Sequence, residues 1–248
     1  MIVFDQLTKA YGGFEAVKPL SLTVERGELF GFLGPNGAGK TTTIRMLMGI
    51  LAPSGGRVLV DGFDCHRDAT EVKRRVGYLP DNPIFYDFLR GREILQFVAE
   101  MHGYPRAEAA LRSDRMLAEF VLDEVSEEFA VNYSLGMKKK LGLACALIHQ
   151  PQVLILDEPI NGLDPRASRD VQDRLRAAAA AGTTIFVSTH LLDMAEKMCD
   201  RVGIIHRGAL VATGTLEQLR ADLAASGSLE EVFLKITDES GESSEPAR

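Results

Sequence analysis

The chain has 248 residues, of which 46% are hydrophobic and 25% are charged, with a formal net charge of -7 and a pI of about 5.3. These values are ordinary for a globular protein, and they exclude a strongly basic surface that would attract nucleic acid or an anionic membrane without specificity. No apolar run approaches the roughly 18 residues of a membrane helix, and the first residues do not form a signal peptide. We therefore expect a cytoplasmic protein that reaches a membrane only through a partner.

The N-terminal segment is typical of two strands joined by a turn. Polar and apolar residues alternate over residues 2–7 and 16–24, and Tyr11-Gly12-Gly13 lies between them. An aromatic residue exposed at a turn shortly before a phosphate-binding loop can stack on an adenine ring. Taken alone, Tyr11 is more simply an ordinary hairpin residue.

The chain is organised around a glycine-rich loop between a predicted strand, residues 29–33, and a predicted helix, residues 42–48. The loop matches the phosphate-binding pattern G-x-x-x-x-G-K-[ST], in which backbone N–H groups and the helix N-terminus face one anion. The predicted nucleotide contacts of this stretch are Gly34, Pro35, Asn36, Gly37, Ala38, Gly39, Lys40, Thr41 and Thr42.

Two side chains of this loop have predicted tasks at a nucleotide. Lys40 is expected to reach the β- and γ-phosphates, and the Thr41 hydroxyl is expected to ligate Mg²⁺. The alternative is a glycine-rich turn that contains Lys-Thr by chance. The strand before the loop and the helix after it favour the nucleotide site.

The middle of the chain changes from mixed to helical character. Strands are predicted for residues 57–62 and 76–80, with a charged helix at 71–75 between them. From residue 87 to about 150 apolar residues recur with helical spacing, which predicts a helical insert in an α/β domain. The apolar positions of these helices are Ile94, Leu95, Phe97, Val98, Met101, Leu111, Met116, Leu117, Phe120 and Val121.

A buried strand over residues 153–156 ends in two carboxylates. Asp157 can hold Mg²⁺ directly or through water, and Glu158 can orient and deprotonate the attacking water. In isolation the pair could be an acidic turn, but the upstream phosphate loop favours the catalytic interpretation. The next strand, residues 183–189, ends at His190, which can hydrogen-bond a γ-phosphate at the same sheet edge, although a lone histidine is more often structural.

The C-terminal part returns to short elements. The predictions are a helix at 191–200, a strand at 202–205, a hairpin arm at 208–214 and helices at 216–225 and 229–236. The tail from 237 to 248 is rich in Ser, Glu and Gly, and we expect it to be disordered.

Taken together, these motifs resemble the ATP-binding subunit of ATP-binding-cassette (ABC) transporters over nearly the whole chain. Tyr133-Ser134-Leu135-Gly136-Met137 is similar to the family signature L-S-G-G-Q, and residues 161–164, Asn-Gly-Leu-Asp, match its D-loop. His190 corresponds to the family's switch histidine. The resemblance implies a P-loop NTPase (RecA-like) α/β core with an N-terminal antiparallel β subdomain and a helical subdomain insert.

The resemblance also implies how the chain is divided. One ATPase domain would cover residues 1–236, with residues 87–150 as the helical signature subdomain. The β subdomain and P-loop core would comprise residues 1–86 and 151–215, followed by C-terminal helices at 216–236. Residues 237–248 would lie outside this domain.

In the family, two such subunits pair head to tail, so that each ATP lies between one subunit's phosphate loop and the other's signature. Ser134, Gly136 and Met137 precede a helix predicted for residues 138–149, whose N-terminus is a second anion-binding end. The resemblance implies ATP contacts in trans for these three residues. It likewise implies a contact for Asp164.

By the same resemblance, Tyr11 stacks on the adenine with Val17 beside it. Two positions depart from the family pattern. Asp81 stands where the Q-loop glutamine is expected, and a carboxylate there can ligate Mg²⁺. Leu135 replaces the first signature glycine, so its β-carbon restricts the backbone. We expect an active ATPase nevertheless.

The implied partners are a second ABC ATPase subunit, identical or related, and a separate transmembrane permease. The apolar loop 84–89 is a candidate docking groove for the permease, although it can equally pack within the chain. The segment 229–233, Leu-Glu-Glu-Val-Phe, resembles subunits that serve ABC-2-like export permeases. The alternatives are a soluble ABC ATPase that acts on ribosomes or DNA, and a P-loop kinase, which leaves the signature and Asp164 unexplained.

Overall fold

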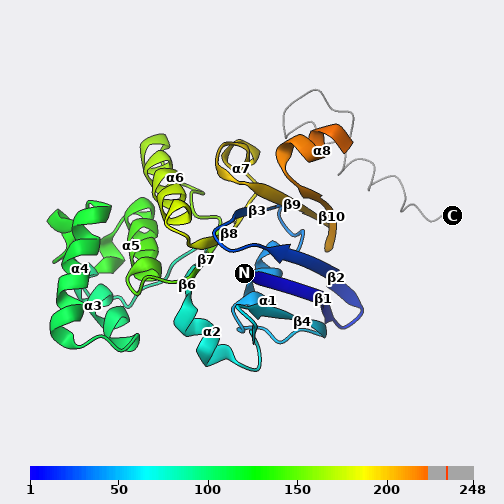
Figure 1. The fold of residues 1–248 in the computed structure, drawn as a ribbon. Coiled ribbons are helices and arrows are strands. Elements are labelled where there is room, and N and C mark those ends of the chain that lie inside the picture. The colour runs from blue at the N-terminus through cyan, green and yellow to red at the C-terminus, as the bar shows by residue number, and fades with distance from the viewer. Residues whose placement is uncertain (223–232, 234–248) are drawn as a thin grey trace.

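The computed structural model describes residues 1–222 and Phe233, arranged as two β-sheets with a group of helices at one side (Figure 1). The strands are β1 (Ile2–Tyr11), β2 (Phe14–Val24), β3 (Leu29–Leu33), β4 (Gly55–Val60), β5 (Phe63–Asp64), β6 (Val76–Leu79), β7 (Val153–Asp157), β8 (Thr184–Thr189), β9 (Arg201–His206) and β10 (Ala209–Gly214). The helices are α1 (Lys40–Leu47), α2 (Ala69–Arg75), α3 (Gly91–Met101), α4 (Arg106–Phe120), α5 (Leu135–Leu147), α6 (Pro165–Ala180), α7 (Leu192–Met198) and α8 (Leu216–Asp222), with 3₁₀ turns η1 (Asp123–Val125) and η2 (Ala130–Asn132).

The six-stranded sheet has the order β10-β9-β3-β8-β7-β6. Strand β3 pairs in parallel with β8 and β9, strand β7 pairs in parallel with β6 and β8, and β10 is antiparallel to β9. All residues of β3, β7 and β8 are buried, as expected of apolar strands in a sheet covered on both faces. The carboxyl ends of these three strands therefore meet at one sheet edge.

The four-stranded sheet, of order β2-β1-β4-β5, packs against the first sheet through aromatic side chains. The ring of Phe186 in β8 lies 5.8 Å from those of Phe4 and Phe30 and 5.3 Å from that of Phe32, centroid to centroid. The N–H of Lys18 in β2 donates to the carbonyl of Gly208 at 2.8 Å. These contacts hold the β1–β2 hairpin beside the phosphate loop.

Helices α3, α4 and α5 form the group at the left of Figure 1, and α5 packs on the edge strand β6. Small residues allow a close approach: a β-carbon at Gly77 would lie 2.0 Å from the Ala146 carbonyl oxygen, and one at Gly142 would lie 2.6 Å from Leu79 Cδ1. The helical group and the six-stranded sheet share one apolar core. The signature helix is therefore firmly joined to the sheet.

The structure corrects two details of the sequence analysis. Helix α5 begins at Leu135, not at Lys138, because the Ser134 side chain caps it and admits Leu135, Gly136 and Met137 to its first turn. In addition, Met101, Leu111 and Val121, which were placed on apolar helix faces, are 72%, 63% and 73% exposed. The predicted helix at 229–236, apart from Phe233, and the predicted disorder at 237–248 lie outside the described residues.

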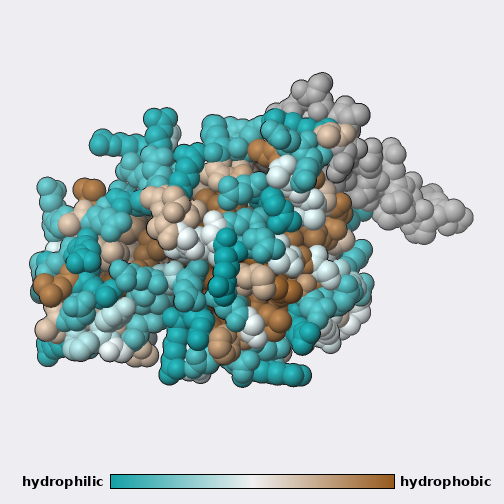
Figure 2. Space-filling view, viewed as in Figure 1, coloured by the Kyte–Doolittle hydropathy of each residue, from teal (hydrophilic) through white to brown (hydrophobic). Residues whose placement is uncertain are grey.

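The surface drawn in Figure 2 is largely hydrophilic, with apolar residues in separate patches. Among the described residues, no helix combines the length and the apolar character needed to span a bilayer. The fold class predicted from the sequence is confirmed: a P-loop core sheet carries an antiparallel β subdomain and a helical subdomain.

Candidate functional site

The site lies at the edge where β3, β7 and β8 end. In the parallel register Leu33 is paired with Thr189, and Asp157 is paired with Ser188. The phosphate loop follows β3, the two carboxylates end β7, and His190 follows β8. The topology thus brings three segments that are distant in the sequence to one edge, as is usual for ligand sites in α/β sheets.

The phosphate loop is shaped by glycine. Gly37 and Gly39 have φ values of 81° and 112°, in the left-handed region that favours glycine. A β-carbon at Gly34 would lie 2.4 Å from the Ile205 carbonyl oxygen. Helix α1 begins at Lys40 directly after this loop, so its first N–H groups have no partner within the helix and face the loop's concave side. This is an anion-binding backbone.

Lys40 is 6% exposed and is held inside the loop that precedes it. Its Nζ donates to the carbonyl oxygens of Gly34 at 2.7 Å and Pro35 at 3.3 Å. The same Nζ lies 3.4 Å from Glu158 Oε1. The Lys40 ammonium therefore lies between the phosphate loop and the carboxylate of Glu158.

Glu158 is buried, and its carboxylate lies between the Lys40 ammonium and the His190 imidazole. Its Oε2 lies 3.0 Å from His190 Nδ1, while Oε1 faces Lys40. Neither carboxylate oxygen has a hydrogen bond of good geometry within the described residues. A buried carboxylate with spare acceptor capacity, beside an anion-binding loop, is suited to hold a water molecule.

Asp157 is 2% exposed and accepts hydrogen bonds from the Ser188 hydroxyl at 2.5 Å and from the Thr41 hydroxyl. Burial raises the pKa of Asp157, whereas both hydroxyls favour its charged form and the nearby carboxylates of Asp81 and Glu158 oppose it. A cation at this point would relieve that repulsion. Sequence reasoning missed Ser188, because only the parallel register places it beside Asp157.

The donor set fits Mg²⁺ held with few protein ligands. The described residues contain no group of three or more His, Cys, Asp or Glu side chains placed to hold a metal by themselves. A site of the Thr41 hydroxyl, the Asp157 carboxylate, phosphate oxygens and water matches the ion's preference for oxygen ligands and retained water.

Asp81 follows β6 and borders the same hollow as Lys40 and Thr41. Its side chain is half exposed, and its Oδ1 lies 3.5 Å from Nζ of Lys139, a residue of α5 that sequence reasoning did not single out. Burial lowers the pKa of Lys139, and the Asp81 carboxylate acts in the opposite direction. Asp81 is thus near the predicted metal position and also has a cationic neighbour.

The hollow over the phosphate loop has a volume of about 320 Å³, and its outer wall is aromatic. Tyr11 and Phe14 face each other across the β1–β2 hairpin and are 50% and 67% exposed. Val17, which was expected beside the adenine, is fully buried below Gly39, and Ala16 lines the hollow instead. Phe14 and Ala16 were missed, because strand alternation alone does not show which hairpin residues face the loop.

The signature residues lie apart from this hollow, which none of residues 134–137 line. Ser134 is the N-cap of α5, where its Oγ accepts the Met137 N–H at 3.3 Å. The substituted Leu135 packs on the D-loop, since a β-carbon at Gly162 would lie 2.8 Å from Leu135 Cδ2. Gly136 is in the same first turn. The free N–H groups of this turn form a second anion-binding end.

Asp164 caps α6 within its own chain. One oxygen, Oδ1, accepts the N–H groups of Arg166 at 2.9 Å and Ala167 at 3.0 Å. These bonds, led by that of Ala167, hold the pKa of Asp164 below its usual value.

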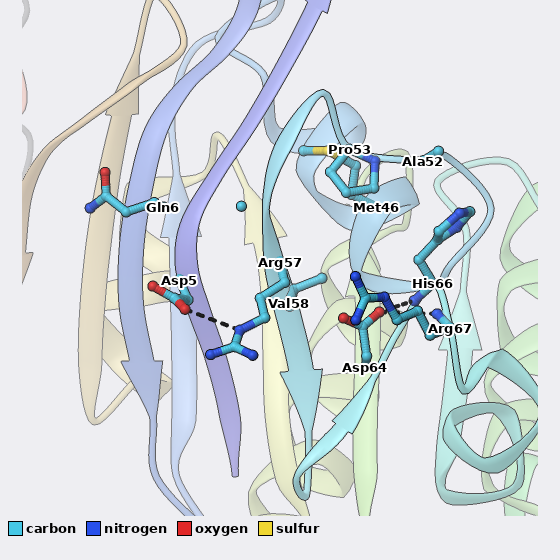
Figure 3. A pocket seen from close by; sticks show the side chains of 11 residues that line it. Asp5, Gln6, Met46, Ala52, Pro53, Arg57, Val58, Asp64, His66 and Arg67 are labelled. Atoms are coloured by element: carbon cyan, nitrogen blue, oxygen red, sulfur yellow. Dashed lines mark hydrogen bonds and ion pairs between the residues drawn. The ribbon is translucent and has the colours of Figure 1, made fainter.

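A second hollow of about 460 Å³ lies between β1, β4 and the turn after β5 (Figure 3). Its carboxylates already have partners: Arg57 Nε lies 3.1 Å from Asp5 Oδ2, and Asp64 accepts the backbone N–H groups of His66 and Arg67. It contains none of the predicted site residues. The phosphate-loop edge is the better candidate.

Known proteins resemble this chain in sequence and in structure. Residues 17–161 match the sequence model of the family described as ABC transporter. Over 221 residues the chain is 39% identical to the daunorubicin resistance ATP-binding protein DrrA3 of Streptomyces coeruleorubidus, an alignment that covers 89% of this chain and 70% of the relative.

Two solved structures extend the comparison. The structure of an ATP-binding subunit of an ABC transporter superposes with a TM-score of 0.89 at 32% identity, covering 95% of this chain and 99% of the other. A dimeric ATP-binding cassette in a post-hydrolysis state, bound to ADP and Pi, superposes with a TM-score of 0.81, covering 87% and 99%. The identity in the second case is 21%, so that likeness is one of fold.

Proposed function

The chain belongs to the ABC transporter family, and we propose that it is the subunit that binds and hydrolyses ATP to drive export through a separate membrane permease. The observation that carries this proposal is the convergence of the phosphate loop, Asp157, Glu158 and His190 at one sheet edge. The resistance function named for the Streptomyces relative supports export. It does not favour a soluble ATPase on ribosomes or DNA.

The phosphate loop binds the nucleotide in this proposal. Backbone N–H groups of residues 34–42, other than Pro35, which has none, surround the phosphates, and Lys40 leaves Glu158 to pair with the β- and γ-phosphates. Tyr11 and Phe14 provide aromatic surface for the adenine. Apart from Gly34 and Ala38, these residues already line one hollow, so the main rearrangement that binding needs is the turn of Lys40 away from Glu158.

Thr41 and Asp157 would hold Mg²⁺, with Asp81 at the rim of the site as a further oxygen donor. When bound, the ion would neutralise charge on the phosphates. Ser188 keeps the Asp157 carboxylate oriented by its short hydrogen bond. The raised pKa of Asp157 agrees with a carboxylate that is stabilised once a cation is near.

Glu158 is the proposed general base. Once Lys40 turns to the phosphates, the Glu158 carboxylate can accept a hydrogen bond from a water molecule in line with the γ-phosphate. It can then take the proton of that water molecule. Since His190 Nδ1 lies 3.0 Å from the other carboxylate oxygen, His190 can orient Glu158 and contact the γ-phosphate. Lys40 stabilises the negative charge of the transition state.

Pairing of two subunits completes the site. The start of α5, with Ser134, Gly136 and Met137, has free N–H groups but does not reach the phosphate loop of its own chain. A head-to-tail dimer would bring it to the partner's nucleotide, together with Asp164. The dimeric cassette of the same fold, bound to ADP and Pi, supports pairing of two subunits. The second subunit is a copy of this chain or a relative.

The proposed permease surface is the loop before α3. Its side chains divide between two environments: Ile84, Tyr86 and Phe88 are 87%, 68% and 86% exposed, whereas Phe85 and Leu89 pack against the core. The Tyr86 ring meets that of Phe97 edge-on at 6.4 Å between centroids. Part of this loop thus packs within the chain, and the exposed part can dock a cytoplasmic helix of the permease at the inner face of the membrane.

Affinity capture tests the assignment to a transporter. The tagged Glu158→Gln variant would be incubated with Mg-ATP and isolated from detergent-solubilised membranes of the producing organism. Recovery of a multi-helix membrane protein in near-equal amount is the expected result. Recovery of ribosomal proteins or DNA without a membrane partner would overturn the proposal in favour of the soluble ATPase.

A further inference from the structure

Helix α5 carries three consecutive lysines, of which the middle one is buried. Lys139 is 2% exposed, whereas Lys138 and Lys140 are half-buried. A buried ammonium is costly unless its hydrogen bonds are satisfied. The partners of Lys139 therefore indicate what the cation does.

The Lys139 ammonium joins two segments of the candidate site. Its Nζ donates to the backbone carbonyl of Glu158 at 2.5 Å, and the same Nζ lies 3.5 Å from Asp81 Oδ1. Asp81 follows β6, and Glu158 follows β7. The cation on α5 thus bridges the ends of two adjacent strands at the phosphate-loop edge.

The peptide that receives this bond is in an unusual conformation. Glu158 has a φ of 49°, in the left-handed region, which is unfavourable for a residue with a side chain. Such a conformation persists only when several contacts hold it. The Glu158 N–H donates to the Ser188 carbonyl at 3.1 Å, and its carbonyl accepts from the Asn161 N–H at 3.2 Å and from Lys139. Lys139 supplies the only charged bond among these three.

We propose that Lys139 is a positioning residue for the ATPase reaction: its ammonium holds the Glu158 peptide so that the carboxylate faces Lys40 and His190, and Asp81 is its counter-ion. This inference rests on the proposed role of Glu158 as general base. It also assigns Asp81 a contact within the chain, in addition to its place at the rim of the metal site. The aspartate that stands at residue 81 in place of the expected glutamine then has an oppositely charged partner, Lys139, on helix α5.

The same bond couples Glu158 to the signature. Lys139 lies five residues after Ser134, about 7.5 Å along a rigid helix. The start of α5 is the part that a partner's nucleotide would contact. The Lys139 bond therefore connects the helix whose first turn a partner's nucleotide would contact to the peptide that carries the proposed base of this chain.

The test compares three variants of the full chain. Lys139→Met keeps the length and apolar stem but removes the donor, and we expect kcat to fall about 10- to 100-fold with the ADP dissociation constant unchanged. Lys139→Arg keeps a cation with donors and should recover most of the loss. Lys138→Met, one residue away, is the matched control and should keep the kcat of the unmodified protein.

Combining Lys139→Met with Glu158→Gln separates a positioning role of Lys139 from a purely structural one. In Glu158→Gln, which has no base to position, adding Lys139→Met should cause no further loss of kcat and leave ATP-dependent dimer formation intact. Three results would overturn the inference: an unchanged kcat in Lys139→Met, a weakened ADP affinity in that variant, or an Arg variant as slow as the Met variant. Normal hydrolysis by Glu158→Gln alone would instead refute the proposed role of Glu158 as general base, which keeps the two failures distinct.

Discussion

The phosphate-loop edge and the start of α5 both present free backbone N–H groups to an anion, but they differ in what their own chain adds. At the first, Lys40, Asp157, Glu158 and His190 converge from three strand ends. At the second, Ser134 caps the helix and the first turn remains on the surface. On the proposed function, this difference means that one chain builds most of its own catalytic site and contributes the start of α5 to the site of a partner.

The largest effect on hydrolysis is expected when the proposed base is removed from the phosphate-loop edge. Glu158→Gln keeps the size of the side chain but cannot accept the proton of water, so hydrolysis should fall about 100- to 10,000-fold. Phosphate release under saturating Mg-ATP measures this. ATP binding should persist, and the variant should accumulate as an ATP-bound dimer in light scattering; turnover like that of the unmodified protein would remove Glu158 as the base.

Removal of the loop cation should weaken binding itself. Lys40→Ala loses charge-assisted hydrogen bonds to the phosphates, each worth about 1.5–3 kcal/mol, so the ADP dissociation constant should rise about 10- to 100-fold. Calorimetric titration measures the change. Lys73→Ala, an exposed lysine on α2, is the control and should bind normally. Normal nucleotide affinity in Lys40→Ala would contradict the loop assignment.

A negative charge at the start of α5 should weaken ATP-dependent dimerisation without changing nucleotide binding by the monomer. Gly136→Asp places a carboxylate where the partner's nucleotide would lie, and it fits sterically because a β-carbon there would be 3.6 Å from Leu163 Cδ2. In the Glu158→Gln background we expect ATP-dependent dimerisation to be weakened about tenfold or more by like-charge repulsion. ADP binding by the monomer should be unchanged.

Gly136→Asn controls for size in that experiment, because it adds the same volume without the charge. The Asp variant should dimerise less well than the Asn variant. Equal dimerisation by both variants, at the level of the parent, would mean that the start of α5 does not face a partner's nucleotide. Sedimentation velocity with and without ATP gives the comparison.

The smallest effect is expected at the aromatic wall. Tyr11→Ala and Phe14→Ala should each weaken ADP binding about fivefold, since stacking of a base on an aromatic ring is worth about 1 kcal/mol or more. Tyr11→Phe retains the ring and should bind as tightly as the unmodified protein. If Phe14→Ala binds normally while Tyr11→Ala does not, the adenine stacks on Tyr11 alone.

Much of the site could be predicted from the sequence, because its motifs are local. The loop from Gly34 to Thr41 needs only a strand before it and a helix after it, and the structure contains both. The acidic end of β7 was likewise recognisable from an apolar run followed by two carboxylates. In each case the chemistry depends on residues that are consecutive in the chain.

Predictions that depended on neighbours across the fold were incomplete. Val17 was expected at the adenine, but the hairpin packs against β9 and β10 so that Val17 is buried and Phe14 faces the hollow. The start of α5 was placed three residues late, because a capping serine decides where a helix begins and its bond to Met137 is not visible in the apolar pattern.

By itself, the sequence determined the P-loop class, the order of strand, loop and helix, and the residue types needed for phosphate, metal and water. Tertiary structure alone decided which of those residues meet: Ser188 beside Asp157, Leu135 on Gly162, and Lys139 between Asp81 and the Glu158 peptide. The physical reason is that motifs follow from short-range backbone geometry. Partners across a sheet edge follow from strand register and helix packing, which the whole core sets together.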